Sequence, residues 1–113
     1  MRRGEIWWAD LGVPFGSEPG YRRPVIIVSS NTFNNSSIST VVIVILTRNL
    51  ALEVADGNFK LPAGTAGLRQ ASVVNVSQIM TADRSRLLEF VSRLPDRYLN
   101  QLNSGLRLSV ALD

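Results

Sequence analysis

The sequence predicts a mainly β protein, either a small barrel or a strongly curved antiparallel sheet, that ends in a C-terminal helix. Short runs of β-branched and aromatic residues alternate with loops rich in glycine and proline, which is typical of all-β folds. Helical spacing of apolar residues is confined to the last third of the chain, which argues against a βαβ fold. With 113 residues, of which 45% are hydrophobic, we expect one domain over residues 1–113.

The expected strands share short, apolar or alternating patterns. They cover residues 4–11, 24–28, 40–47, 58–61 and 72–81, and the polar segments 12–20, 31–39 and 62–67 are expected to be loops. The run TVVIVILT at 40–47 is apolar on both faces, so both faces need cover. We expect a homodimer to cover its outward side chains, because so small a domain would leave them exposed. In 72–81, strict alternation places Val74, Val76 and Gln78 opposite Ile79.

The last third of the chain is partly ambiguous. Residues 83–94 fit either a helical face or a helical turn followed by a strand. Pro95 and Asp96 are favourable first-turn residues, so a helix is expected to begin there. Its apolar face would carry Leu99, Leu102, Leu106 and Val110, although residues 106–112 also alternate like a strand. Gly105 within this helix costs about 1 kcal/mol relative to alanine.

Composition excludes several classes of function. The chain contains no cysteine and no histidine, which removes disulfide frameworks, Ser-His and Cys-His nucleophiles and the commonest metal ligand. It also lacks a P-loop, a dinucleotide fingerprint and a metal-ligand cluster, so no cofactor and no metal are expected. The start of the chain does not resemble a signal peptide, and no apolar run approaches the roughly 20 residues of a membrane span. We therefore expect a cytoplasmic protein without a membrane partner.

The charge distribution points to an anionic partner. Net charge is +3, and all but one of the 12 cationic residues are arginine, the exception being Lys60. Arginine carries a planar fork that suits phosphate, although arginine codons of a GC-rich genome would give the same bias. The excess charge favours nucleic acid as the partner.

Polar residues gather at the ends of the expected strands. Arg23 precedes the second strand and Thr47 closes the third, so the two lie close together if these strands pair across the 29–39 loop. Each residue also has a simpler interpretation. Arg23 could form only a surface ion pair with Glu18, Thr47 could be only a β-former, and Gln78 could be a buried amide rather than a ligand contact. The spacing of these residues alone predicts only a basic, β-rich protein that binds nucleic acid.

Longer blocks of the sequence add a family resemblance. RRGEIWWADL at the start, followed by GSEPGYRRPVIIVSSN, TVVIVILT, ASVVNVSQIMTAD and RLLEFVSRLPD, resembles the MazF/PemK family of toxin endoribonucleases over essentially the whole chain. The resemblance implies an SH3-like barrel with a C-terminal helix that acts as a homodimer. Members of this family cut single-stranded mRNA without a metal, and the C-terminal segment of a cognate antitoxin blocks them in the same groove.

The resemblance also assigns roles to single residues. It places the family's essential arginine on Arg23, its hydroxyl partner on Thr47 and its loop glutamate on Glu18. Three further residues match positions that line the RNA groove: Phe15, Ser17 and Gln78. Family members often carry an acidic residue near Ala71, and its absence here leaves the base preference open.

The chemistry of metal-free RNA cleavage fits these residues. The 2′-hydroxyl of the substrate is the nucleophile, so the protein needs none. A guanidinium aimed at the phosphate stabilises the charge that develops, and one such donor is commonly worth about 3–4 kcal/mol. Arg23 suits this role, and Thr47 can donate to a non-bridging oxygen. Glu18 is a candidate for the general base, or it only orients Arg23.

Two other functions are compatible with a small basic barrel. A topoisomerase poison resembling CcdB would need no chemistry at Arg23, and a non-catalytic barrel would bind nucleic acid in a salt-dependent way and leave it whole. The G-S-E and R-P blocks around Arg23 favour the endoribonuclease over both.

Overall fold

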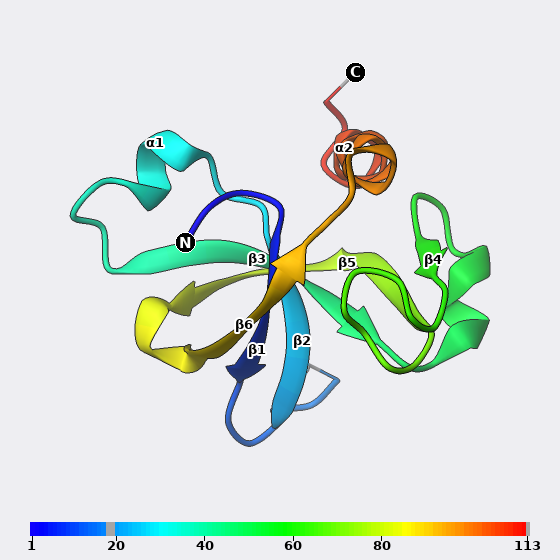
Figure 1. The fold of residues 1–113 in the computed structure, drawn as a ribbon, viewed down its shortest axis with the longest axis horizontal. Helices are drawn as coiled ribbons and strands as arrows, with labels where there is room; N and C mark the ends of the chain where they lie inside the picture. The colour runs from blue at the N-terminus through cyan, green and yellow to red at the C-terminus, as the bar shows by residue number, and fades with distance from the viewer. Residues whose placement is uncertain (18–19, 113) are drawn as a thin grey trace.

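The computed structural model describes residues 1–17 and 20–112 and contains a single curved antiparallel sheet of six strands in the order β4-β5-β3-β2-β1-β6 (Figure 1). The strands are β1 (Glu5–Asp10), β2 (Arg22–Ile27), β3 (Thr40–Thr47), β4 (Phe59–Leu61), β5 (Ser72–Asp83) and β6 (Leu87–Arg93). The helices are α1 (Asn31–Asn34) and α2 (Asp96–Ser109), and two 3₁₀ turns are η1 (Leu50–Val54) and η2 (Arg84–Arg86). The predicted fold class, a mainly β, barrel-like sheet with a C-terminal helix, is confirmed.

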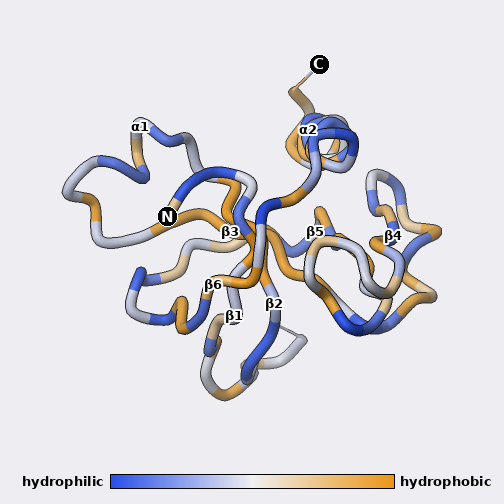
Figure 2. Tube along the Cα trace, viewed as in Figure 1, coloured by the Kyte–Doolittle hydropathy of each residue, from blue (hydrophilic) through white to orange (hydrophobic). Residues whose placement is uncertain are grey.

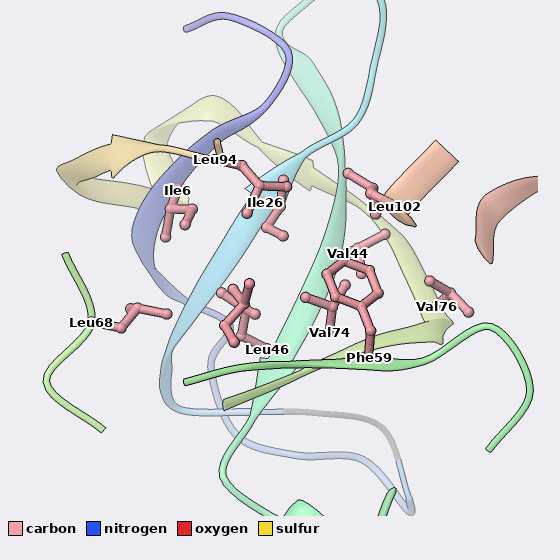
Figure 3. Close-up of a cluster of buried hydrophobic side chains, with 11 residues drawn as sticks. Ile6, Ile26, Val44, Leu46, Phe59, Leu68, Val74, Val76, Leu94 and Leu102 are labelled. Atoms are coloured by element: carbon pink, nitrogen blue, oxygen red, sulfur yellow. The ribbon is translucent and has the colours of Figure 1, made fainter. Parts of the chain in front are cut away.

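The first apolar cluster lies between the sheet and α2. It takes the even-numbered residues of the central strands, because alternate side chains of a strand point to one face. Ile26 and Val44 are fully buried there, and Figure 3 shows Leu102 of α2 beside them. Figure 2 shows the resulting amphipathic character of α2, which mixes hydrophobic and hydrophilic residues around its axis.

The second apolar cluster lies on the opposite face of the same sheet. It takes Val25, Val41, Ile43 and Ile45, each with at most 2% of its surface exposed. The curvature of the sheet therefore covers both faces of β3 within one chain. Our expectation that a partner subunit is needed to cover the outward side chains of 40–47 is wrong.

A bulge interrupts β5. Val44 of β3 pairs with Ile79, but the next residue, Ile45, pairs with Asn75, so residues 76–78 have no partner on β3. The bulge shifts the alternation, and Ile79 packs on the same cluster as Val74 rather than opposite it, which corrects our prediction. Side chains from other segments bind the backbone of the first residue of the bulge, Val76.

These side chains hold both backbone groups of Val76. Asn58 Oδ1 accepts from its N–H at 2.9 Å, and Ser109 Oγ donates to its carbonyl at 2.8 Å. The bulge is thereby connected to the residue that precedes β4 and to α2.

Several local predictions are decided by the structure. Residues 83–94 form a 3₁₀ turn and then a strand, as the second of our two interpretations has it. The segment 31–39 is not all loop, because Ser30 Oγ accepts from Phe33 N at 3.3 Å and caps the short helix α1. The strand alternative for 106–112 is wrong, since α2 continues to Ser109.

None of the helices in the described residues has the length and apolar character to cross a membrane.

Candidate functional site

An open cleft of about 660 Å³ lies where β2 begins and β3 ends. Its wall continues through Trp8 of β1 and through the segment 67–70 that precedes β5. These segments meet because β2 and β5 both pair antiparallel with β3, which brings the start of each of them beside the end of β3. In Figure 1 the loop between β1 and β2 lies at the opposite end of the molecule from α2.

Arg23 and Thr47 both line this cleft, and the predicted pairing of their strands is confirmed. Val25 pairs with Ile45, and continuing that register by two residues places Arg23 opposite Thr47. Residues directly opposite in an antiparallel pair project from the same face of the sheet. The two side chains therefore leave the sheet on one side, at neighbouring strand ends.

Within the described part of the chain, each of the two side chains is anchored by a hydrogen bond to the backbone. Arg23 Nε donates to Gly20 O at 3.1 Å, and no other described residue binds the terminal amino groups of the fork. Thr47 Oγ1 accepts from Asn49 N at 3.1 Å, so its own hydrogen is left to donate. Both residues are half-buried. The pair thus presents oriented donors to the cleft.

The electrostatics of the cleft favour an anion. Its lining carries Arg22, Arg23, Arg48 and Arg69 and, within the described residues, no aspartate or glutamate. Arg22 is engaged by neighbouring side chains: its Nη2 lies 3.1 Å from Glu89 Oε2, and its Cζ lies 5.2 Å from the centre of the Trp8 ring. Such a concentration of like charge in a concave site raises the local concentration of anionic ligands.

Not all predicted site residues line the cleft. Phe15 and Ser17 lie in the β1–β2 loop, where Phe15 is 79% exposed, and Gln78 lies half-buried in the bulge of β5. Of the described residues that line the cleft, none is one of these three. Glu18 lies outside the described residues, so its predicted ion pair with Arg23 stays a prediction.

The structure also brings in residues that sequence reasoning missed. Arg69 and Gln70 line the cleft, although only their neighbour Ala71 was named from the sequence, as a position that bears on base preference. The signal was available, because these residues directly precede the strand that begins at Ser72, and an antiparallel partner places that start beside Thr47. Trp8 is half-buried at the rim of the cleft.

Fold and cleft together define a class: a small curved β-sheet protein with an arginine-lined cleft at its strand ends, suited to a polyanion. A family model described as PemK-like, MazF-like toxin of type II toxin-antitoxin system matches residues 2–110, and the chain belongs to this family. This confirms the resemblance.

Individual relatives agree with the family. The chain is 43% identical over 107 residues to Endoribonuclease MazF6 of Mycobacterium tuberculosis, covering 95% of this chain and 94% of that protein. It is 29% identical over 112 residues to Endoribonuclease EndoA of Bacillus subtilis, covering 99% and 96%.

Solved structures have the same fold. MazF from Deinococcus radiodurans matches with a TM-score of 0.82 at 22% identity, covering 99% of this chain and 97% of that one. An endoribonuclease in complex with its cognate antitoxin, from a mycobacterial species, matches with a TM-score of 0.80 at 23% identity, covering 100% and 97%.

Proposed function

We propose that the chain is the toxin of a type II toxin–antitoxin system and acts as a metal-independent, sequence-preferring endoribonuclease on single-stranded mRNA, so that it inhibits translation and growth. The observation that carries this proposal is the placement of Arg23 and Thr47 at adjoining strand ends in an arginine-lined cleft. Membership of the toxin family and endoribonuclease relatives at up to 43% identity support it. Single-stranded RNA suits a sequence-preferring enzyme, because its bases are free to be contacted edge-on.

The reaction uses groups that the cleft can supply. The 2′-oxygen of the substrate attacks the adjacent phosphorus and the bond from phosphorus to the 5′-oxygen breaks, which leaves a 2′,3′-cyclic phosphate. The leaving 5′-oxygen takes its proton from Arg23 or from water. Arg23 stabilises the negative charge that builds on the phosphoryl oxygens, and Thr47 donates to one of them and fixes its position. Glu18 either accepts the proton of the 2′-hydroxyl or orients Arg23.

The proposal extends to the partners of the chain. Phe15, Ser17 and Gln78 contact RNA that runs beyond the cleft, and the C-terminal segment of a cognate antitoxin occupies the same groove. A relative of the same fold is named as a complex with its cognate antitoxin, which supports this. The whole chain, residues 1–113, acts as one domain in the cytoplasm.

We also propose that the chain forms a homodimer, and that the dimer surface is the edge strand β6 and not the buried faces of β3. β6 is an edge strand of the sheet, and Leu88 and Phe90 on it are 52% and 49% exposed. An edge strand with exposed apolar side chains is a surface that a second subunit can cover.

The test is RNA cleavage in EDTA by wild type, Arg23→Ala and the matched control Arg107→Ala, which removes an exposed arginine of α2. Loss of a donor to the developing charge predicts a fall of about 10²–10³-fold in single-turnover rate for Arg23→Ala and no change for the control. Intact RNA with wild type, or cleavage unchanged in Arg23→Ala, contradicts the proposal. Inhibited DNA supercoiling with intact RNA would instead identify a topoisomerase poison.

A further inference from the structure

A hydrogen bond spans one wall of the cleft. Arg48 Nη1, just beyond the end of β3, donates to Gln70 Oε1 at 2.9 Å, and both residues line the cleft. Both side chains are solvent-exposed, so this bond is not part of the core. It connects the strand that carries Thr47 to the loop that precedes β5.

This bond fixes which end of the Gln70 amide faces a ligand. The guanidinium of arginine has donors only, so the atom that faces Arg48 must be the carbonyl oxygen of the amide. The amino group of Gln70 is therefore held on the other side as a donor. Among the described residues, no acceptor binds that amino group.

Gln70 lies within about one nucleotide's reach of the place proposed for the reacting phosphate. Val73 pairs with Thr47, and Gln70 precedes Val73 by three residues, which is about 10 Å of extended chain. Arg69, beside it in the chain, adds a cation to the same wall. A nucleotide adjacent to the scissile bond can thus place its phosphate near Arg69 and its base edge near Gln70.

We propose that Gln70 determines specificity: its amino group donates to the exocyclic carbonyl oxygen of a keto base, uracil or guanine, and Arg48 is the positioning residue that holds the amide in this orientation. Keto bases present an acceptor where adenine and cytosine present an amino donor, so a fixed donor separates the two groups. This inference rests on the proposed function, because it concerns which RNA sequence the nuclease cuts.

Two substitutions test the two roles. Gln70→Glu keeps the shape of the side chain but replaces the free amino group with an acceptor oxygen, while Arg48 still binds the other oxygen. We expect the preference at one position of the cut site to shift by about tenfold from keto toward amino bases. Arg48→Met leaves Gln70 in place but frees the amide to turn over, so discrimination should flatten at that same position.

The measurement is cut-site mapping by primer extension on a long transcript, beside thermal denaturation of each variant. Gln101→Glu is the matched control, because it makes the same change on an exposed residue of α2 away from the cleft, and it should leave the preference unchanged. If Gln70→Glu proves inactive, Gln70→Met, which removes the donor without adding charge, should lose discrimination at the same position.

The outcomes separate this inference from the proposed function. An unchanged preference in an active Gln70→Glu or Gln70→Met variant overturns the inference and leaves the nuclease in place. A change at different positions in the Gln70 and Arg48 variants also overturns it. Intact RNA with the wild-type protein rejects the proposed function itself, and this inference with it.

Discussion

Thr47 is the residue whose proposed role is the easiest to separate from its structural role. Its hydroxyl oxygen accepts from Asn49 N, and its hydrogen is left for the substrate. Thr47→Val keeps the β-branched shape but removes the donor. A hydrogen bond to a charged group is worth about 1.5–3 kcal/mol, so single-turnover cleavage should fall about 10- to 100-fold.

Thr40→Val is the control for this experiment, since Thr40 occupies the other end of the same strand and is also half-buried. It should cut RNA at the wild-type rate. Equal rates in the two variants, measured at saturating enzyme, would mean that the Thr47 hydroxyl takes no part in the reaction.

The sequence predicts the proximity of Arg23 and Thr47 for a simple reason. Both residues flank apolar runs, and antiparallel pairing of consecutive strands then brings the beginning of one beside the end of the next. Gln70 has the same signal for its place in the cleft, because it precedes the strand that pairs with the end of β3, but its contact with Arg48, 22 positions away in the sequence, cannot be read from the pattern. The catalytic assignments of Arg23 and Thr47 rest on family resemblance and stay predictions.

The packing of α2 on the β3–β4 connection depends on a close approach at Gly105. A Cβ added there would lie 2.5 Å from Gly57 O and 2.9 Å from Val76 Cγ1. Gly105→Ala should therefore destabilise the protein by about 1–2 kcal/mol, because the clash exceeds the roughly 1 kcal/mol gained in helix propensity.

Urea denaturation measures this effect, and Ser104→Ala is the control on the adjacent, exposed position of the helix. Ser104→Ala should be neutral or slightly stabilising. A more stable Gly105→Ala variant would show that α2 can move away from Gly57 at little cost.

The β5–β6 connection should give a pH-dependent contribution to stability. The backbone N–H of Ser85 and then its hydroxyl donate to Asp83, at 2.9 and 2.7 Å, and with the nearby Arg86 they lower the pKa of this carboxyl below its ordinary 3.8. The folded state favours the charged form, so this contribution is present above pH 3.8 and is lost as pH falls through the lower folded pKa.

Asp83→Ala should consequently melt at a lower temperature than wild type at neutral pH, and the gap should narrow as pH falls well below 3.8. Ser85→Ala removes only the hydroxyl bond and should lower the melting temperature less. A gap that is constant with pH would show that the carboxylate charge is not what holds η2.

The elements with strong patterns are those that the sequence predicts well. β3 has the predicted bounds, 40–47, because a continuous β-branched run has few alternatives. The sequence does not reveal the bulge at 76–78. Its three unpaired residues continue the alternation of apolar and polar residues, so the segment is typical of a regular strand. α1 spans only four residues, too short for any helical periodicity to show.

The overall shape explains why a chain of this size folds with so apolar a central strand. The sheet curls so that one cluster is covered by α2 and the other by the sheet itself. The sequence predicts a curved sheet, but apolar content does not show that this curvature alone buries both faces of β3, so we expected a second subunit as cover. The dimer surface is better sought at the exposed edge strand β6 than on the faces of β3.

The modest net charge of +3 hides a strong local field, because the cleft lining concentrates four arginines. Binding of RNA should therefore depend on the cleft arginines and not on net charge. For single strands, each phosphate contact contributes about 0.7 to the slope of log affinity against log salt concentration. Arg69→Gln should reduce the magnitude of that slope by about 0.7, measured with an RNA made non-cleavable by 2′-deoxy substitution.

Arg107→Gln changes the net charge by the same amount on an exposed position of α2. Its slope should match wild type, because a charge that releases no counterion from RNA contributes nothing to the salt dependence. If both variants reduce the slope equally, the RNA follows a path over α2 as well, and the cleft does not by itself form the electrostatic site. If only Arg69→Gln reduces the slope, the local concentration of arginine in the cleft governs RNA binding, and the net charge of the whole chain does not.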